Sequence, residues 1–590
     1  MSKYIQFIQE VKYIVGSESK KIPLMVLFFI FSSFLDVIGI GLIAPYISLI
    51  INPESFLQGS FNAYLTPIMS WAQIDNMLIF IGIILIVIFF FRMAAVFLIN
   101  RMIIKFSYEK GTQIRTVLMD SYQNLPYIDH LKRNSSQSKY AILSLSVEFA
   151  NNTLQSILRL ISEGIVVIAI VLYLFWTSGI EIGIFVFIFG IVFYVYDAIF
   201  RHRLIVYGKS VNDNSRQLIQ GVDEAIDGLK EIRILKKESY FYNKVVVTSK
   251  NIANASVISS IIKLSPRYLI EFLIMLLVVS LVYVSILFDR NMAGLAATLG
   301  VFGVAAIRLI PSINQILNGF MQLNNSRNAV SLLFSDLKSL KEEDYFEKKY
   351  KQTHCIALRN ITLKNVDYTY PGTDQKVLNN ISMSINAGDS IGLIGKSGSG
   401  KSTLIDLLLG FLEADSGELL VNNELLNTNI GAWRDLVAYL PQQIFLTDNT
   451  MKANIALGVE NHQIDNQKIA QALERSKLTN FVQSLPDGVE TILGEKGVRL
   501  SGGQRQRVAL ARAFYHDRDV LVMDESTSAL DNETEAEIVR EIKQLKGIKT
   551  VIVIAHRLTT LKYCDCIYRL DNGEIVEYGS YNSIMNKHNA

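Results

Sequence analysis

The sequence predicts a multidomain membrane protein, in which an all-α six-helix transmembrane domain is followed by a cytosolic α/β domain. Three observations support this fold class. The chain has 590 residues, enough for two to four domains. Half of its residues are hydrophobic and 19% are charged, whereas an ordinary soluble domain carries about 25% charge. The long apolar runs all lie before residue 321, and short β-branched runs alternating with helical patterns follow them.

Six apolar runs are each long enough to cross a bilayer, which takes about 20 residues of helix. They are Pro23–Ile51, Met77–Ile104, Leu154–Trp176, Ile180–Phe200, Tyr268–Phe288 and Ala293–Phe320. Buried helices of a large soluble core are the alternative interpretation. Phe80–Phe91 reads FIGIILIVIFFF and has no polar face for solvent, so the membrane interpretation is favoured.

The distribution of Lys and Arg predicts the orientation of these spans. Residues 52–76 contain neither residue type, whereas residues 101–139 contain seven and residues 201–263 are also rich in both. Basic loops stay in the cytoplasm, so we expect both termini on the cytoplasmic side. The two basic loops are helix-patterned, so the spans should continue as helices below the membrane.

Charge and cysteine content exclude other classes of protein. Lys and Arg total 57 and Asp and Glu total 54, giving a net charge of +3. This near-balance argues against a nucleic-acid partner. Three cysteines are too few for a disulfide scaffold of this size. A charged segment, DLKSLKEEDYFEKKYK, predicts a linker at residues 336–353 between a membrane domain (residues 1–335) and a soluble domain (residues 354–590).

A phosphate-binding loop follows the predicted strand Ser390–Ile394 and precedes an apolar helix. Its residues are Gly395, Lys396, Ser397, Gly398, Ser399, Gly400, Lys401, Ser402 and Thr403. Glycines let backbone N–H groups converge on phosphate, and the helix N-terminus adds its dipole. We expect Lys401 to reach the β- and γ-phosphates and Ser402 to ligate Mg²⁺. A chance lysine in a Gly/Ser loop is the alternative, and the strand–loop–helix context disfavours it.

An acidic pair ends a second buried strand, Leu521–Asp524. Asp524 is placed to hold Mg²⁺ through water, and Glu525 is placed to polarise the attacking water. In isolation such a pair is often only a helix N-cap. Here it belongs to a domain that already has a phosphate loop, which favours the catalytic interpretation.

Leu500–Gln504, with the sequence LSGGQ, predicts a second anion-binding helix start. Ser501, Gly502, Gly503 and Gln504 are too far along the chain to belong to the first loop. Two phosphate-binding helix starts in one domain make sense if each nucleotide lies between two copies of that domain.

With these motifs, residues 360–580 resemble the ATP-binding cassette (ABC) family, whose signature is LSGGQ. The resemblance implies ATP and Mg²⁺ as cofactors. It also implies that Tyr370 stacks on adenine, that Gln442 senses Mg²⁺ and contacts the membrane domain, and that His556 contacts the γ-phosphate. A lone histidine would otherwise be a structural or surface residue.

Six spans followed by one cassette resemble the type I exporter architecture, also called type IV. One cassette cannot form a composite site, so two chains must pair. All cassette motifs are intact, which favours a homodimer, and the resemblance implies a multi-pass protein of the bacterial cytoplasmic membrane.

Three arginines lie in or beside the predicted spans: Arg92, Arg267 and Arg308. Arg92 and Arg308 each lie 15 positions into their span, or about 22 Å from its outer end. Guanidinium groups suit phosphate or pyrophosphate because each binds two oxygens at once. One alternative is internal ion pairing, of Arg267 with Glu271, of Arg159 with Glu163, and of Asp36 with another arginine. Another is that the long arginine side chains snorkel to the inner membrane boundary.

The contexts of these arginines, FFFRMAA, SPRYLIEF and AIRLIPS, resemble bacterial ABC flippases for lipid-linked oligosaccharides. A small amphipathic helix expected at Phe56–Trp71 adds to this resemblance. It implies an undecaprenyl-pyrophosphate-linked glycan as substrate. Export of a peptide, a drug or a lipid A-like lipid stays open. A cassette ATPase acting on nucleic acid is excluded by the spans, and importers usually keep the two kinds of domain on separate chains.

Overall fold

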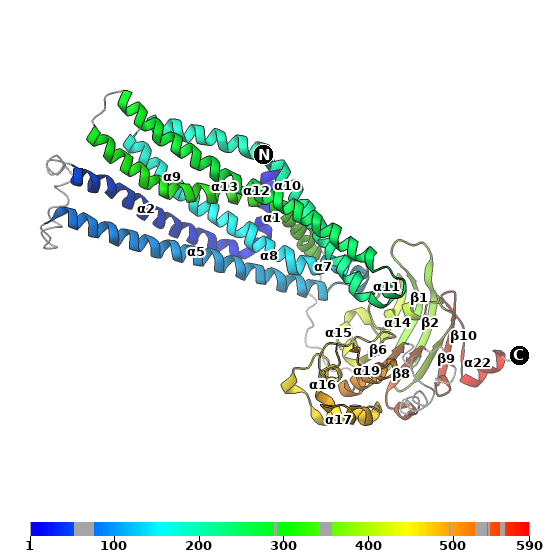
Figure 1. Cartoon of the computed structure of the whole chain (residues 1–590). Coiled ribbons are helices and arrows are strands. Elements are labelled where there is room, and N and C mark those ends of the chain that lie inside the picture. The colour runs from blue at the N-terminus through cyan, green and yellow to red at the C-terminus, as the bar shows by residue number, and fades with distance from the viewer. Residues whose placement is uncertain are drawn as a thin grey trace. The chain divides into compact units, whose positions relative to one another are not determined.

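The computed structural model describes residues 2–51, 76–178, 180–287, 292–342, 357–494, 497–524, 540, 543–554 and 561–588. The chain divides into two compact units, coloured from blue to green and from yellow-green to red in Figure 1. The first comprises Met1–Leu125 and His130–Phe346, and the second comprises Pro126–Asp129 and Glu347–Ala590. The predicted linker begins inside a helix that ends at Glu342, and the rest of the linker lies outside the described residues.

The first unit is helical, and its longest helices lie side by side (Figure 1). These six are α2 (Ile22–Ile51), α5 (Met77–Gln123), α9 (Gln155–Ser178), α10 (Ile180–Asp227), α12 (Glu238–Leu287) and α13 (Met292–Glu342). Shorter helices are α1 (Ser2–Val15), α7 (Ser135–Tyr140), α8 (Ser146–Glu148) and α11 (Leu229–Ile234), and α6 (Tyr127–Lys132) belongs in part to the second unit. One 3-10 helix (Gly16–Lys21) and two π-helical segments (Ala141–Leu145 and Phe149–Leu154) complete the unit.

The length and surface of these helices fit a membrane. Within the described residues, four helices are long and apolar enough to span one: those covering Ile5–Ile47, Met77–Gln123, Ser135–Trp176 and Glu238–Leu273. Much of the other two expected spans, Ile180–Phe200 and Ala293–Phe320, lies outside the described side chains. Phe90, Phe97 and Leu172 are more than half exposed, as lipid-facing side chains are.

Four of the long helices extend well past their expected spans, as the sequence predicted. α5, α10, α12 and α13 have 47, 48, 50 and 51 residues. At 1.5 Å per residue each is about 70 Å long, more than twice the thickness of a bilayer's hydrocarbon core.

The second unit contains two sheets. The antiparallel sheet has the order β2-β1-β4-β5, with β1 Asn360–Thr369, β2 Lys376–Asn386, β4 Ser416–Val421 and β5 Glu424–Leu425. The second sheet has the order β10-β9-β3-β8-β7-β6. Its strands are β3 Ser390–Ile394, β6 Val437–Leu440, β7 Val520–Asp524, β8 Thr550–Ile554, β9 Cys566–Asp571 and β10 Glu574–Gly579. Parallel strands buried on both faces read as continuous apolar runs, and β8 (TVIVI) is buried throughout.

The helices of this unit pack on separate cores. α14 (Lys401–Leu408) contributes Leu404, Ile405, Leu407 and Leu408 to a core that joins the two sheets. α16 (Met451–Ile455), α17 (Asn466–Arg475), α18 (Thr479–Gln483) and α19 (Gly502–His516) share a second core. α15 (Ile430–Leu436) and α22 (Tyr581–His588) complete the described helices. The two predicted anion-binding helix starts, of α14 and α19, are therefore anchored independently.

Candidate functional site

Four loops that carry predicted nucleotide residues leave the same edge of the six-stranded sheet. β3, β8, β7 and β6 are neighbours in this order and run parallel. β3 leads into the phosphate loop, β7 ends at Asp524, and β6 precedes Gln442. β8 ends at Ile554, just before the segment that holds His556. Ligands of parallel sheets bind at this carboxyl edge, so the fold brings the predicted segments together.

Two glycines shape the phosphate loop. Gly398 has a φ of +80° and Gly400 a φ of +99°, values that side chains with a Cβ rarely adopt. A Cβ on Gly400 would also lie 2.7 Å from Leu378 Cδ2 on β2. The loop can therefore turn directly from β3 into the first turn of α14 only with glycine at these positions.

Two polar side chains inside this loop fit a phosphate ligand. Lys401 is 6% exposed, and its Nζ donates to the carbonyl oxygens of Gly395 and Lys396 at 2.8 and 2.9 Å. The Ser399 hydroxyl is buried and has no hydrogen-bond partner among the described atoms. A buried hydroxyl without a partner is costly, and a phosphate oxygen would supply an acceptor.

Asp524 lies in a cluster of acidic and aromatic side chains. Tyr439 Oη donates a long hydrogen bond of 3.5 Å to Asp524 Oδ2. Burial, together with the charge of Asp524, raises the pKa of Asp406 on α14 to about 6 and also raises the pKa of Tyr439. A divalent cation beside Asp524 would offset both carboxylates, which fits Mg²⁺. Asp406 was not predicted from the sequence, because LIDLLLG reads as an apolar helix with no signal of a site.

Other predicted nucleotide residues lie around the start of α14. Tyr370 Oη is 3.3 Å from Thr403 Oγ1, and its ring makes an edge contact of 5.1 Å with Tyr368. The ring expected to stack on adenine is therefore beside the first turn of α14. Ser402 and Gln442 are both exposed, as residues that meet a ligand in solution would be.

The second anion-binding helix start is built as a capping box. Ser501 Oγ accepts from the Gln504 backbone N–H at 3.2 Å, and Gln504 Oε1 accepts from the Ser501 N–H at 2.8 Å. This reciprocal pair fixes the start of α19, and Gly502 and Gly503 form its first turn. Their N–H groups belong to the four that a helix leaves without an intrahelical partner.

Several predicted residues lie outside the described residues. They include the expected general base Glu525, the expected switch residue His556 and the side chain of Arg267. The expected external helix at Phe56–Trp71 is also outside them.

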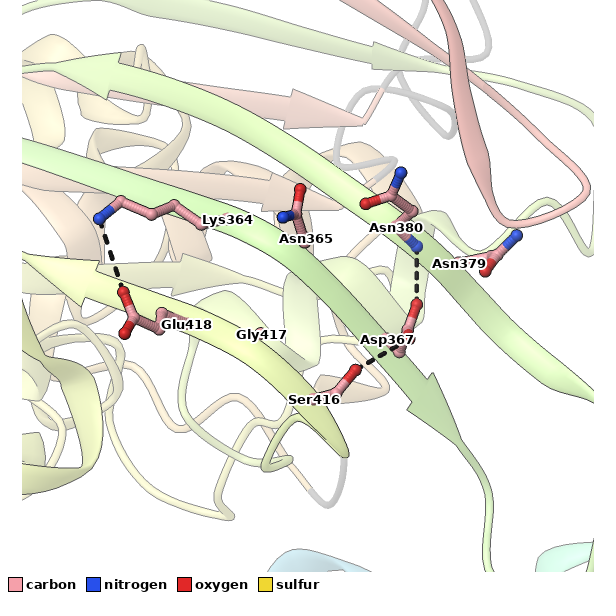
Figure 2. A pocket seen from close by; sticks show the side chains of 8 residues that line it. All are labelled: Lys364, Asn365, Asp367, Asn379, Asn380, Ser416, Gly417 and Glu418. Atoms are coloured by element: carbon pink, nitrogen blue, oxygen red, sulfur yellow. Dashed lines mark hydrogen bonds and ion pairs between the residues drawn. The ribbon is translucent and has the colours of Figure 1, made fainter.

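A polar hollow of about 540 Å³ lies on the antiparallel sheet, away from these motifs (Figure 2). Its central acid, Asp367, accepts from Lys376 Nζ and Ser416 Oγ, each at 2.8 Å, and from the Asn380 backbone N–H at 2.7 Å. These contacts, led by Lys376, lower the pKa of the Asp367 carboxyl to about 2. The acid is satisfied by its own neighbours, so the hollow is a structural feature of the sheet.

In the helical unit, Arg92 and Arg308 meet at one carboxylate, that of Asp36 on α2, which is 3% exposed. Arg308 on α13 donates to it through Nε at 3.1 and 3.2 Å and through Nη2 at 3.2 Å. Arg92 on α5 makes an ion pair with the same carboxylate through Nε. Asp36 therefore contacts both arginines, and its single negative charge offsets one of their two positive charges.

Arg308 also contacts a second acid. Its Nη1 lies 3.5 Å from Glu163 Oε2 on α9 and donates to Ser312 Oγ at 3.1 Å. The Ser312 hydroxyl in turn donates to Glu163 Oε2 at 2.6 Å. Glu163, considered above as a partner of Arg159, thus joins Arg308 and Asp36 in a network across three helices.

The two arginines are not equivalent in this network. Arg308 uses Nε, Nη1 and Nη2, and 14% of its side chain is exposed. The contact of Arg92 Nε with Asp36 lacks the alignment of a hydrogen bond, and 25% of its side chain is exposed. Neither Nη group of Arg92 has a hydrogen bond to a described residue. Arg92 therefore keeps donors for another partner.

Comparisons with known proteins agree with this architecture. Residues 378–528 match the family described as ABC transporter. The chain is 31% identical over 490 residues to the ATP-dependent lipid A-core flippase of Photobacterium profundum, covering 81% of this chain and 80% of that protein. It is 30% identical over 450 residues to the flippase of the same name from Escherichia coli K12, covering 75% of each.

A solved structure shows the same fold over nearly the whole chain. A bacterial Atm1-family ABC exporter with ATP bound matches with a TM-score of 0.76, at 18% sequence identity, and the match covers 97% of this chain and 96% of that one. The predicted fold class, a helical membrane domain followed by an α/β nucleotide-binding domain, is confirmed.

Proposed function

We propose that this chain, which belongs to the ABC transporter family, is a flippase for a lipid-linked oligosaccharide. It is an exporter half-transporter that couples ATP hydrolysis to transport. The cargo is amphipathic and anionic, with a polyprenyl chain joined to a glycan through pyrophosphate. The protein moves it from the inner to the outer leaflet of the bacterial cytoplasmic membrane. Arg92, Arg308 and Arg267 form a cationic belt, within which Arg92 supplies the donors that meet the pyrophosphate.

The observation that carries this proposal is the state of Arg92. A guanidinium inside a span costs about 2.5–3.5 kcal/mol on insertion scales, so its donors are normally used. Arg92 is held by an ion pair with Asp36 that is not aligned as a hydrogen bond, and its Cζ lies over the Phe89 ring, 5.5 Å from the ring centroid. A purely structural arginine would bond through its Nη groups, whereas a ligand-binding arginine must keep them available for the two oxygens of a phosphate.

The nucleotide half of the proposal follows from the two helix starts. ATP binds with Mg²⁺ between Lys401 of one chain and Ser501 of a second identical chain, so the working unit is a homodimer. Asp524, Ser402 and Gln442 hold the Mg²⁺, and Glu525 activates the attacking water. The Lys and Arg content of the loops supports a cytoplasmic location for both termini and both nucleotide-binding domains.

A second candidate cargo is a lipid of the kind that the curated relatives are named for, lipid A with its core sugars. It is also an anionic phosphorylated glycolipid, so the same arginines suit it. The two candidates differ in the headgroup, because a polyprenyl carrier presents a pyrophosphate bridge between lipid and sugar.

Flipping in proteoliposomes tests the proposal. A fluorescent polyprenyl-pyrophosphate oligosaccharide and a fluorescent lipid A-core lipid are each offered to the wild type with ATP. We expect ATP-dependent flipping of the first, and we expect Arg92→Ala and Arg308→Ala to abolish it. Arg92→Lys should rescue only in part, because lysine keeps the charge and loses the planar fork.

Arg101→Ala is the matched control, since Arg101 is an exposed arginine farther along the same helix α5. It should flip at the wild-type rate. Flipping of the lipid A-core lipid alone would assign the protein to the second cargo. If both alanine variants in the span flip the pyrophosphate lipid normally, these arginines are structural and the assignment fails.

A further inference from the structure

We propose that Asp36 is an internal anion that Arg92 leaves when cargo binds and to which Arg92 returns when cargo is released. This role rests on the proposed function, because the incoming partner is the acidic headgroup of a lipid. Asp36 would thereby set how tightly the cavity holds its cargo and how fast the cargo leaves.

The geometry identifies Arg92 as the arginine that exchanges. Asp36 Oδ2 accepts from Nε and Nη2 of Arg308, and Oδ1 accepts from Nε of Arg308 as well, which gives a two-pronged pair. The ion pair of Arg92 with Asp36, through Nε and Oδ1, lacks hydrogen-bond alignment. A two-pronged guanidinium–carboxylate pair is the stronger kind, so Arg308 stays with Asp36 and Arg92 is the partner that departs.

The exchange leaves no charge unpaired. When Arg92 turns to a phosphate, the carboxylate of Asp36 keeps the two-pronged pair with Arg308, whose other side keeps Glu163 and Ser312. A bare carboxylate in the membrane would be very costly, and this arrangement avoids it. The unused Nη groups of Arg92 can meet the first phosphate oxygen before the contact with Asp36 breaks.

The same contact favours release of the cargo. Asp36 lies on α2 and Arg92 on α5, two helices that pack against each other, so the competing carboxylate is tethered next to its target. A tethered competitor acts at a high effective concentration. It weakens the apparent affinity for cargo, because Arg92 is competent only in the fraction of molecules where it has left Asp36. It also replaces the departing phosphate, which speeds release.

The decisive variant is Asp36→Asn, which keeps the shape of the side chain and removes its charge. Flipping and lipid-stimulated ATP hydrolysis are measured in proteoliposomes against the mole fraction of a polyprenyl-pyrophosphate-linked monosaccharide. We expect the half-maximal mole fraction to fall at least about fivefold, because Arg92 no longer has a resident anion to leave. We expect the maximal rate to fall as well, because release slows. Asp36→Glu restores a carboxylate and should return both values towards those of the wild type.

Asp197→Asn is the matched control. Asp197 is another acid within a predicted span, on α10, but it accepts from the amide of Asn324 at 3.2 Å. It should shift neither value. Melting temperatures of all variants report whether they fold. If Asp36→Asn does not fold, Asp36→Ser is a second neutral variant, and we expect the same direction of change in it.

The outcomes separate the two proposals. A wild type that does not respond to the pyrophosphate lipid refutes the proposed cargo, and the exchange with it. Suppose instead that the wild type responds to this lipid and that a neutral variant at position 36 folds. If the half-maximal mole fraction of that variant is unchanged or higher, the exchange alone is refuted. A purely structural Asp36 would give the second result, with lower stability and no gain in affinity.

Discussion

Replacing Arg308 by alanine should destabilise the helical unit far more than replacing Arg92. Arg308 makes three hydrogen-bond contacts with Asp36, one with Ser312 and an ion pair with Glu163. Its removal leaves two acids with little compensation, one of them 3% exposed. Breaking a buried pair in this way costs about 3–5 kcal/mol. Removing Arg92 leaves the pair of Asp36 with Arg308 intact, so the cost should be clearly smaller.

Unfolding by sodium dodecyl sulfate, followed by tryptophan fluorescence in mixed micelles, measures this difference. Two of the three tryptophans, Trp71 and Trp176, belong to the helical unit. All three cysteines (Cys355, Cys564 and Cys566) belong to the second unit, so a thiol-reactive dye reports its unfolding separately. We expect the fluorescence midpoint to fall strongly in Arg308→Ala and slightly in Arg92→Ala, with thiol labelling unchanged in both. Equal losses, or a larger loss in Arg92→Ala, would contradict the unequal roles assigned to the two arginines.

Three further predictions concern the nucleotide site. Glu525→Gln should trap an ATP-bound dimer and slow hydrolysis by at least about 100-fold, the scale of a lost general base; near-normal hydrolysis by purified protein would place the base elsewhere. Ser399→Ala should leave nucleotide-free stability unchanged or raise it by about 1 kcal/mol, because it deletes a buried hydroxyl without a partner; a drop in melting temperature would show that this hydroxyl is already satisfied. Mixed dimers with Lys401→Ala in one chain and Ser501→Ala in the other should keep one intact site and hydrolyse ATP. Homodimers of either variant should not hydrolyse ATP, and ATP hydrolysis by isolated monomers would refute the composite site.

The nucleotide site was largely predictable because its determinants are local. The phosphate loop depends on a buried strand, positive-φ glycines and a helix start that are contiguous in sequence, and the structure places them in this order. The order of the strands was not predictable, because Ser390 on β3 pairs with Val551 on β8, far along the chain. Asp406 was missed for the same reason: its proximity to Asp524 depends on how α14 packs against the sheet.

The arginines of the membrane unit show where sequence reasoning ends. Their presence within spans is visible in the sequence, and in the structure Arg92 and Arg308 both contact a carboxylate. The sequence analysis sought partners mainly one helical turn away, as Glu271 is from Arg267. Arg308 instead contacts Asp36, 272 positions away along the chain. Which faces of the helices meet is decided by packing over the whole unit, and no local pattern records it.

The two units hold anions in different ways, and this difference has a functional consequence. In the proposed nucleotide site the donors are backbone N–H groups and Lys401 of the phosphate loop, so ATP would meet donors that need no internal anion. In the membrane the charges of Arg92 and Arg308 are offset by Asp36 and Glu163, because a net charge there would be too costly. On the proposed exchange, an anion enters the second kind of site by replacing a resident carboxylate. Loss of an acid should therefore weaken the nucleotide site, where Asp524 is proposed to hold the metal, and tighten the cargo site, where Asp36 competes for the arginine.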